Sequence, residues 1–239
     1  MSTEIPPAGP EPGAAAKLQI LATEHWSLLA TRSLTYTEAL SRVTIFLAIL
    51  SGGVITLALV AQADSFGRTF ISIAIPLLTV VLFAGIATIS RLNALNRDDY
   101  RWVIGMNRLR HAYLQMHPEL EPHFITSHYD DLRGGLQTLG LDHMTDRPGL
   151  GSAFHLLQTL PGMLTLIVAA VAGAIGALVA LAVAVPAFGA VLAGAAAFVL
   201  VVVLMGIGGR RSVTAVPPSL VPRFPSPVSS GRAPDRTSC

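Results

Sequence analysis

The fold is decided by residues 148–209, which read PGLGSAFHLLQTLPGMLTLIVAAVAGAIGALVALAVAVPAFGAVLAGAAAFVLVVVLMGIGG. No Asp, Glu, Lys or Arg occurs in this stretch, and most of its residues are Ala, Val, Leu and Gly. A bilayer core takes about 20 helical residues for each crossing, so the stretch is too long for one membrane span. The sequence therefore predicts two spans, residues 161–185 and 187–208, joined by a tight turn at Pro186.

A second apolar block, residues 43–90, repeats this pattern. Asp64 and Gly67 mark the turn in its middle, which predicts spans at 43–63 and 69–90. Each span reaches about 30 Å at about 1.5 Å per residue, which matches the hydrocarbon core of a bilayer. We therefore expect an all-α integral membrane protein with two transmembrane helical hairpins, four spans in all, and a helical cytoplasmic domain between them.

The composition agrees with a membrane protein. Of the 239 residues, 52% are hydrophobic and 13% are charged, whereas a soluble domain carries about 25% charged residues. The mean hydropathy is +0.60. The net charge of +2 gives no indication of nucleic-acid binding, and the single cysteine, Cys239, excludes an intrachain disulfide. Residues 1–16 are polar and rich in proline, so we expect no signal peptide and insertion through the first span.

The segments outside the two hairpins, 43–90 and 158–209, are polar. Thr35 and Glu38 have the spacing of a capping box, which would begin a new helix at Tyr36, although the same spacing also arises by chance. The expected polar segments are a disordered tail at 1–13, a cytoplasmic amphipathic helix at 14–42, a cytoplasmic helical region at 91–157 and a disordered Pro- and Arg-rich tail at 210–239.

The most regular pattern in the chain is a stripe of large side chains within residues 92–116. They recur in alternating steps of three and four, as in a coiled coil. We expect this stripe to contact a second copy or a partner protein, or else to pack on the N-terminal helix around Leu21 and Leu28. The candidate interaction residues are Leu92, Leu95, Trp102, Met106, Leu109, Tyr113 and Met116.

No helix breaker separates this stripe from the span before it, so one long helix of about 45 residues is expected to continue out of the membrane. Pro118 is expected to end that helix. Asp99 interrupts the stripe, and Arg97 and Arg101 are near enough in sequence to solvate its carboxylate.

The basic residues predict the orientation. Lys17 and every arginine except Arg68 fall on one side of the membrane if both hairpins cross and return. The positive-inside rule assigns that side to the cytoplasm. We therefore expect a multi-pass protein of the bacterial inner membrane, with both termini and residues 91–157 in the cytoplasm.

Signals for chemistry are weak. The predicted spans contain no ionisable side chain, which argues against ion pumps and proton-coupled transporters. Six histidines lie in residues 91–157, but none are three or four residues apart, and no HExxH motif or Cys pair occurs. A Walker loop and a nucleophile elbow are also absent. We expect no catalytic residue, no metal and no cofactor.

Two further patterns point to contacts. Small residues four apart, such as Gly173 with Ala177 and Ala190 with Gly194, let helix backbones approach closely. These rows indicate either packing within the second hairpin or a face for self-association. The PxxP spacing of Pro222 and Pro225, like that in the N-terminal tail, favours a polyproline II segment that docks on a partner, although it is often incidental in a Pro-rich tail.

Residues 96–113, NRDDYRWVIGMNRLRHAY, followed by His117-Pro-Glu-Leu-Glu-Pro122, resemble a segment of uncharacterised bacterial multi-span membrane proteins, and this resemblance covers residues 18–157. The layout is also similar to that of SLATT-type two-span membrane effectors. That second resemblance implies a membrane hairpin with a cytoplasmic helix rich in aromatic and Arg residues, and pore formation in bacterial conflict systems. Trp102, Arg108 and Arg110 match it, whereas the second hairpin departs from it.

Taken from the sequence, the expected function is that of a non-enzymatic, membrane-anchored helical module that oligomerises or binds a protein partner. The alternatives are a pore-forming membrane effector, which the second resemblance implies, and a transporter of neutral or lipophilic solutes, which would need no buried charge. The expected surroundings are the lipid bilayer and a second copy or protein partner, with no nucleic acid.

Overall fold

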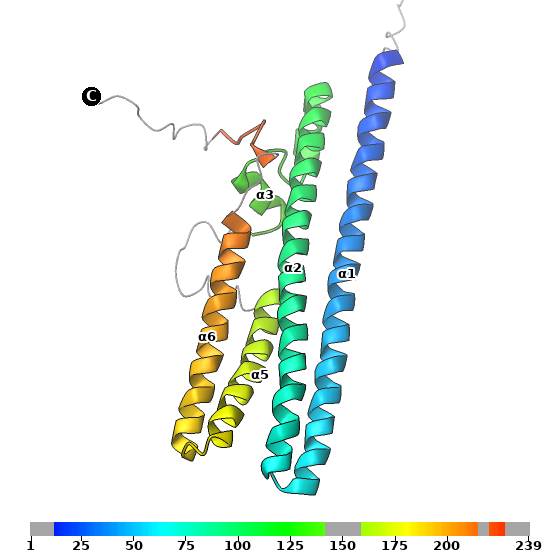
Figure 1. Cartoon of the computed structure of the whole chain (residues 1–239). Helices are drawn as coiled ribbons and strands as arrows, with labels where there is room; N and C mark the ends of the chain where they lie inside the picture. Colours follow the sequence, from blue (N-terminus) through cyan, green and yellow to red (C-terminus); the bar gives the residue numbers. More distant parts are fainter. Residues whose placement is uncertain (1–11, 142–158, 215–219, 228–239) are drawn as a thin grey trace, which may run out of the picture. The chain divides into compact units, whose positions relative to one another are not determined.

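The computed structural model describes residues 12–141, 159–214 and 220–227 of the chain. Every regular element among these residues is a helix, and no strand occurs in them (Figure 1). The all-α prediction is confirmed for this part of the chain. The elements are α1 (Pro12–Asp64), α2 (Arg68–Met116), the 3₁₀ turn η1 (Pro118–His123), α3 (Leu132–Thr138), α5 (Leu160–Ala182) and α6 (Ala187–Thr214).

Four of these helices, α1, α2, α5 and α6, are long and apolar enough to cross a membrane. Helices α1, α2 and α6 contain the predicted spans 43–63, 69–90 and 187–208, whereas α5 ends at Ala182, three residues before the predicted end of the span 161–185. A continuous apolar helix satisfies its backbone hydrogen bonds internally, as a bilayer requires. The chain thus has the helices of a multi-pass membrane protein.

The chain divides into two compact units. The first consists of Met1–Leu34, Asp99–Asp146 and Pro217–Cys239, and the second of Thr35–Asp98 and Arg147–Val216. Both α1 and α2 continue from one unit into the other.

The second unit has an apolar core to which α1, α2 and α5 contribute. Gly85 on α2 lies where the three helices meet, because a Cβ atom there would collide with the side chain of Val168 on α5 and lie 3.0 Å from the ring of Phe46 on α1. The buried core residues are Ala39, Phe46, Leu78, Val81, Ile89, Leu92, Leu95, Leu164, Val168 and Val171. At the edge of this unit, Glu38 of α1 accepts hydrogen bonds from Arg91 of α2 at 3.0 Å and from Arg42 at 2.9 Å.

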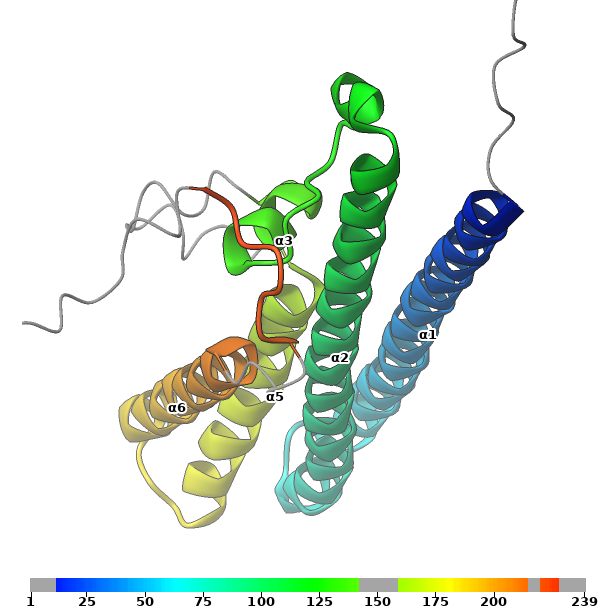
Figure 2. The same cartoon turned by 90° about the horizontal axis from the view of Figure 1, so that it is seen from above.

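Helices α5 and α6 lie side by side (Figures 1 and 2) and touch through small residues. A Cβ atom on Gly173 would be 3.1 Å from the carbonyl oxygen of Gly194, and one on Gly194 would be 2.9 Å from that of Gly173. A Cβ atom on Gly176 would be 2.9 Å from the Cβ of Ala197. The interpretation of the small-residue rows as packing between these two helices is therefore confirmed.

Both connections between apolar helices are tight. After α1, the carboxylate of Asp64 accepts a hydrogen bond from the backbone N–H of Phe70 at 2.8 Å, which satisfies a free donor at the start of α2. A Cβ atom on Gly67 would lie 2.8 Å from that carboxylate and 3.0 Å from the backbone carbonyl oxygen of Asp64, so a larger residue would displace the carboxylate from this contact. After α5, Ala184 has a φ of 59°, and the N–H of Val185 donates to the carbonyl of Ala180 at 3.0 Å, as in a Schellman motif.

The predicted start of a new helix at Tyr36 is wrong. Helix α1 runs from Pro12 to Asp64 without a break, so Thr35 does not cap a helix, and the carboxylate of Glu38 bonds to Arg91 and Arg42. The long continuous helix through the stripe is confirmed, since α2 ends at Met116, just before Pro118.

Candidate functional site

In the first unit, residues 99–116 of α2 are covered on one side by α1. Leu28 lies against Gly105, where a Cβ atom would be 3.1 Å from the leucine side chain. The rings of His25 and Tyr113 stack with their centroids 6.0 Å apart. These contacts are of the kind expected if the stripe packs on the N-terminal helix.

Asp99 is buried in this contact and forms an ion pair with Arg32 of α1. The Nε of Arg32 donates to Oδ1 of Asp99 at 2.6 Å, and a terminal nitrogen donates to Oδ2 at 3.3 Å. The sequence suggested Arg97 and Arg101 because they are close along the chain. The pair with Arg32 spans 67 positions of the sequence and was not indicated by the sequence pattern.

The structure places the seven stripe residues in different surroundings. Leu92 and Leu95 are buried in the core of the second unit, and Met106 is buried in the first. Trp102, Leu109, Tyr113 and Met116 are half-buried. The indole N–H of Trp102 is shielded from solvent and has no hydrogen-bond partner in the described part of the chain.

The opposite side of the same α2 segment carries α3 and the chain before it, and the sequence pattern did not reveal this contact. The residue of α2 at the centre of this contact is Asn107, which is fully buried. Its side-chain NH₂ donates to the carbonyls of Tyr129 at 2.8 Å and Gly134 at 3.2 Å, and its side-chain oxygen accepts from Arg110 at 2.8 Å and Thr138 at 2.9 Å. One amide thereby fixes both ends of residues 129–138 to α2.

Asp131 begins α3 as its N-cap, accepting the backbone N–H of Gly134 at 2.8 Å. Close packing explains the two glycines that follow. A Cβ atom on Gly134 would collide with the Tyr129 carbonyl, and one on Gly135 would lie 2.7 Å from the ring of Tyr100 on α2.

The two carboxylates of Asp130 and Asp131 hold a segment from the C-terminal part of the chain. Asp130, with no exposed side-chain area, accepts the backbone N–H groups of Arg223 at 2.8 Å and Phe224 at 2.7 Å. Its own N–H donates to the carbonyl of Phe224 at 3.2 Å. Asp131 accepts both the N–H of Ser226 at 3.1 Å and its hydroxyl at 2.6 Å. We call Asp130, Asp131, Arg108 and His111 the tail site.

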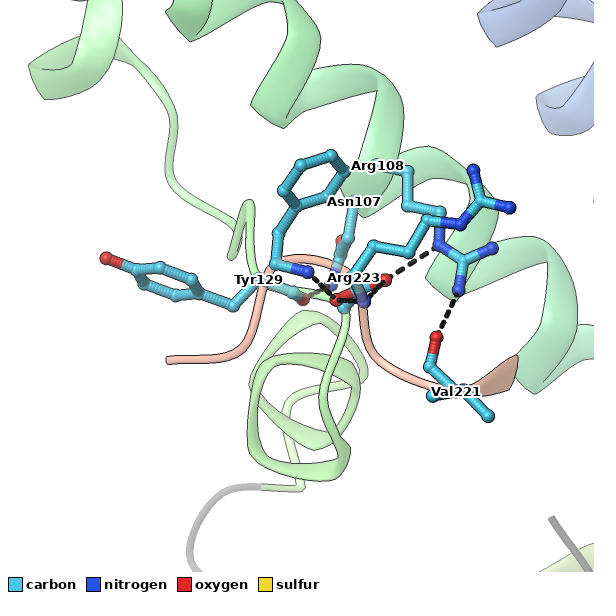
Figure 3. A network of polar contacts seen from close by, with 7 residues as sticks. Asn107, Arg108, Tyr129, Val221 and Arg223 are labelled. Atoms are coloured by element: carbon cyan, nitrogen blue, oxygen red, sulfur yellow. Dashed lines mark hydrogen bonds and ion pairs between the residues drawn. The ribbon is translucent and has the colours of Figure 1, made fainter. Parts of the chain in front are cut away.

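Arg108 and His111 complete the tail site from α2. The Nε of Arg108 donates to Asp130 at 2.7 Å, and another of its nitrogens donates to the carbonyl of Val221 at 3.0 Å (Figure 3). The ring of His111 stacks on that of Phe224, with centroids 4.0 Å apart and planes inclined by 20°. His128 lies beside His111, with a ring separation of 5.8 Å.

The surroundings of Asp130 and His111 lower the pKa of both side chains. Burial alone would raise the pKa of Asp130, but the hydrogen bonds from the N–H of Arg223, from Arg108 and from the N–H of Phe224 outweigh it and lower the pKa. Burial also lowers the pKa of His111, and the neighbouring His128 lowers it further. The site therefore favours an ionised Asp130 and a neutral His111.

The prediction that residues 210–239 form a disordered tail is wrong for two parts of that range. Helix α6 continues to Thr214, and residues 220–227 are ordered against the tail site. Helix α1 begins at Pro12, so the last two residues of the predicted tail at 1–13 are helical, and that part of the prediction is also wrong. The remainder of both predicted tails lies outside the described residues. One sequence signal, the PxxP spacing of Pro222 and Pro225, indicated a docking segment, but nothing in the sequence linked it to Asp130 and Asp131.

Within the described residues, no three His, Cys, Asp or Glu side chains come together in a way that would hold a metal ion. His143 and His155 lie outside those residues. The chemistry that the tail site offers is the binding of an extended peptide, because its carboxylate oxygens accept backbone N–H groups and its imidazole ring covers an aromatic side chain. Comparison with protein-family models, curated proteins and solved structures finds no match to this chain.

Proposed function

We propose that this chain is a four-span protein of the bacterial inner membrane, with two transmembrane hairpins formed by α1 with α2 and by α5 with α6. Both termini and the first unit are assigned to the cytoplasm. The distribution of basic residues supports this topology, because only Arg68 lies in a turn between two spans. The short connections between α1 and α2 and between α5 and α6 support the pairing of the spans.

Its proposed role is that of a non-enzymatic, membrane-anchored helical module that associates with a second copy of itself. One observation carries this role. The part of α1 that belongs to the first unit exposes five large apolar side chains: Leu18, Ile20, Trp26, Leu29 and Leu34. Trp26 has 71% of its surface exposed and Ile20 69%. Exposed apolar surface of this kind is typical of an interaction face.

A second copy is the partner that this surface fits best. Leu18, Trp26 and Leu29 fall on one face of α1 at helical spacing, whereas the face with His25 and Leu28 is occupied by α2. A row along one helix can pair with the same row of another copy across a two-fold axis. The stripe of α2 is less suited to this role, because Leu92, Leu95 and Met106 are already buried within the chain.

Cysteine cross-linking in native membranes tests this association. In a Cys239→Ser background, Ala22→Cys places a thiol in the middle of the row, between Leu18 and Trp26. Oxidation should yield a disulfide-linked dimer. The matched control is Glu24→Cys, which is exposed and turned away from the row, and it should give little dimer. Equal cross-linking at both positions, or a monomeric mass in detergent together with no cross-link at position 22, would refute self-association through α1.

A further inference from the structure

Residues 222–226, Pro-Arg-Phe-Pro-Ser, are bound by the tail site as an extended peptide would be. The segment has three backbone N–H groups, on Arg223, Phe224 and Ser226, and the carboxylates of Asp130 and Asp131 accept all three. The other two positions are Pro222 and Pro225, which have no N–H to donate. The spacing of the prolines therefore matches the spacing of acceptors in the site.

From Arg223 to Ser226 the side chains alternate between solvent and the site. Phe224 and Ser226 face inward, where the phenyl ring stacks on His111 and the hydroxyl donates to Asp131. Pro222, Arg223 and Pro225 are exposed. Such alternation is characteristic of an extended segment, and it confines side-chain recognition to two positions.

The site has a strong requirement for a ligand with these donors. Without the segment, the buried carboxylate of Asp130 would lose the N–H donors of Arg223 and Phe224, and that of Asp131 would lose both donors of Ser226. A buried charge that loses its donors is costly. Any segment that reaches the site with the same N–H pattern would meet this requirement, whichever molecule carries it.

We propose that the tail site is a docking site for an extended Pro-x-Phe-Pro-Ser segment, and that a second copy of this chain can supply residues 222–226 in place of the chain's own. Every copy carries an identical segment, so exchange between two copies preserves each hydrogen bond and the ring stacking, as in domain swapping. This exchange is a contact distinct from the proposed row on α1 and goes beyond it.

The first test measures peptide binding. The chain lacking residues 220–239, purified in detergent, is titrated with a fluorescent peptide of residues 220–227, LVPRFPSP. Saturable binding is expected, and Asp130→Asn should weaken it at least about tenfold, because charge-assisted hydrogen bonds are lost. A peptide with Ala in place of Phe224 and one of scrambled sequence are the controls. Equal affinity of the truncated chain and its Asp130→Asn variant would overturn the docking site.

If the truncated chain fails to fold, the full chain with Phe224→Ala and Ser226→Ala takes its place. That variant retains every residue of the site but weakens the resident segment, so the added peptide should bind it more tightly than it binds the unaltered chain. No gain in peptide binding would also overturn the docking site.

The second test identifies the occupant with complementary variants. An acceptor copy lacks residues 220–239, and a donor copy carries Asp130→Asn and Asp131→Asn with an intact segment. In one experiment, donor and acceptor carry different tags and are co-expressed, and the donor that co-purifies with the acceptor is measured. In the other, two acceptor copies with different tags are co-expressed and measured in the same way. More donor than acceptor should be captured, and free LVPRFPSP peptide should remove only this excess.

The comparison separates the two proposals. If acceptor does not co-purify with acceptor, self-association through the row on α1 is contradicted. The docking of a second copy is still tested in that case, because donor can still co-purify with acceptor through the tail site. Equal capture of donor and acceptor, despite binding of the free peptide, would overturn the second copy as occupant of the tail site.

Discussion

At position 107, a single buried amide connects α2 to two carbonyls, an arginine and a threonine. We expect Asn107→Ala to destabilise the attachment of residues 129–138 to α2 by about 3 kcal/mol, because it leaves several buried polar groups without a hydrogen-bond partner. Hydrogen exchange at residues 129–138 measures the effect, which should appear as faster exchange. Gln115→Ala, at an exposed position of the same helix, is the control and should leave exchange unchanged.

The titratable groups of the tail site predict that acid releases residues 222–226. The pKa of His111 is lowered, so docking is strongest above the ordinary histidine value of about 6.5 and weakens as the pH falls below it. The pKa of Asp130 is lowered too, so its contribution is present above about pH 4 and is lost as the pH falls through its depressed pKa. Both groups therefore act in the same direction.

A fluorescent label on Cys239 reports this release as a fall in anisotropy. The first fall is expected between about pH 7 and 5 and the second below about pH 4. In the variant His111→Phe, which keeps a ring against Phe224 but cannot titrate, the first fall should disappear and the second remain. A first fall that persists in that variant would show that another group controls it.

At the scale of the elements, α5 and α6 depend on the absence of side chains where they touch. Gly194→Ala would place a Cβ atom 2.9 Å from the carbonyl oxygen of Gly173, so the helices must separate. We expect a loss of about 1–3 kcal/mol, measured by thermal unfolding in detergent. Gly206→Ala on the same helix meets open space and should be neutral or slightly stabilising.

The four apolar helical segments could be predicted from the sequence, because their signals are local. A run of apolar residues with a turn at Gly67 or Pro186 specifies a helix, a break and another helix, whatever lies elsewhere in the chain. Steps of three and four in residues 92–116 likewise marked a face of α2, of which Leu92, Leu95 and Met106 are buried.

The tail site could not be predicted in the same way, because its parts are about 95 positions apart in the sequence. In the sequence, the adjacent acids Asp130 and Asp131 look like a solvated pair, and a proline-rich stretch looks disordered. In the structure, the carboxylates accept hydrogen bonds from the backbone N–H groups of that stretch. The same holds for Arg32 and Asp99. Local periodicity identifies which residues share a face, but not which distant side chain covers it.

For the whole molecule, the topology makes a direct prediction. Reporter domains fused after Phe66 and Pro186 should be found outside the cytoplasm, and those fused after Leu120 and Cys239 inside it, because the basic residues are retained on the cytoplasmic side. Alkaline phosphatase and green fluorescent protein fusions at each position provide opposite readouts and control for one another. A cytoplasmic reporter at Phe66 would contradict the four-span topology.

The polar groups in the first two spans predict whether the membrane protein conducts ions. A hydrated ion path needs polar partners in the bilayer core, and only hydroxyls such as those of Thr56, Thr79 and Thr88 are available there. Each of these three already donates to a carbonyl of its own helix, at 2.8, 2.7 and 2.8 Å. Helices α5 and α6 contribute almost only Ala, Val, Leu and Gly to the membrane.

We therefore expect the chain to be electrically silent. Induced expression in bacteria should leave the membrane potential, read with a voltage-sensitive dye, equal to that of cells carrying the empty vector, while an added ionophore should collapse it in both. Depolarisation would instead favour the pore-forming effector. In that case a chain without residues 158–209 should still depolarise the cells in part, since the hydroxyls available to line a pore belong to α1 and α2, and further substitution of Thr56 and Thr79 by valine should reduce the effect.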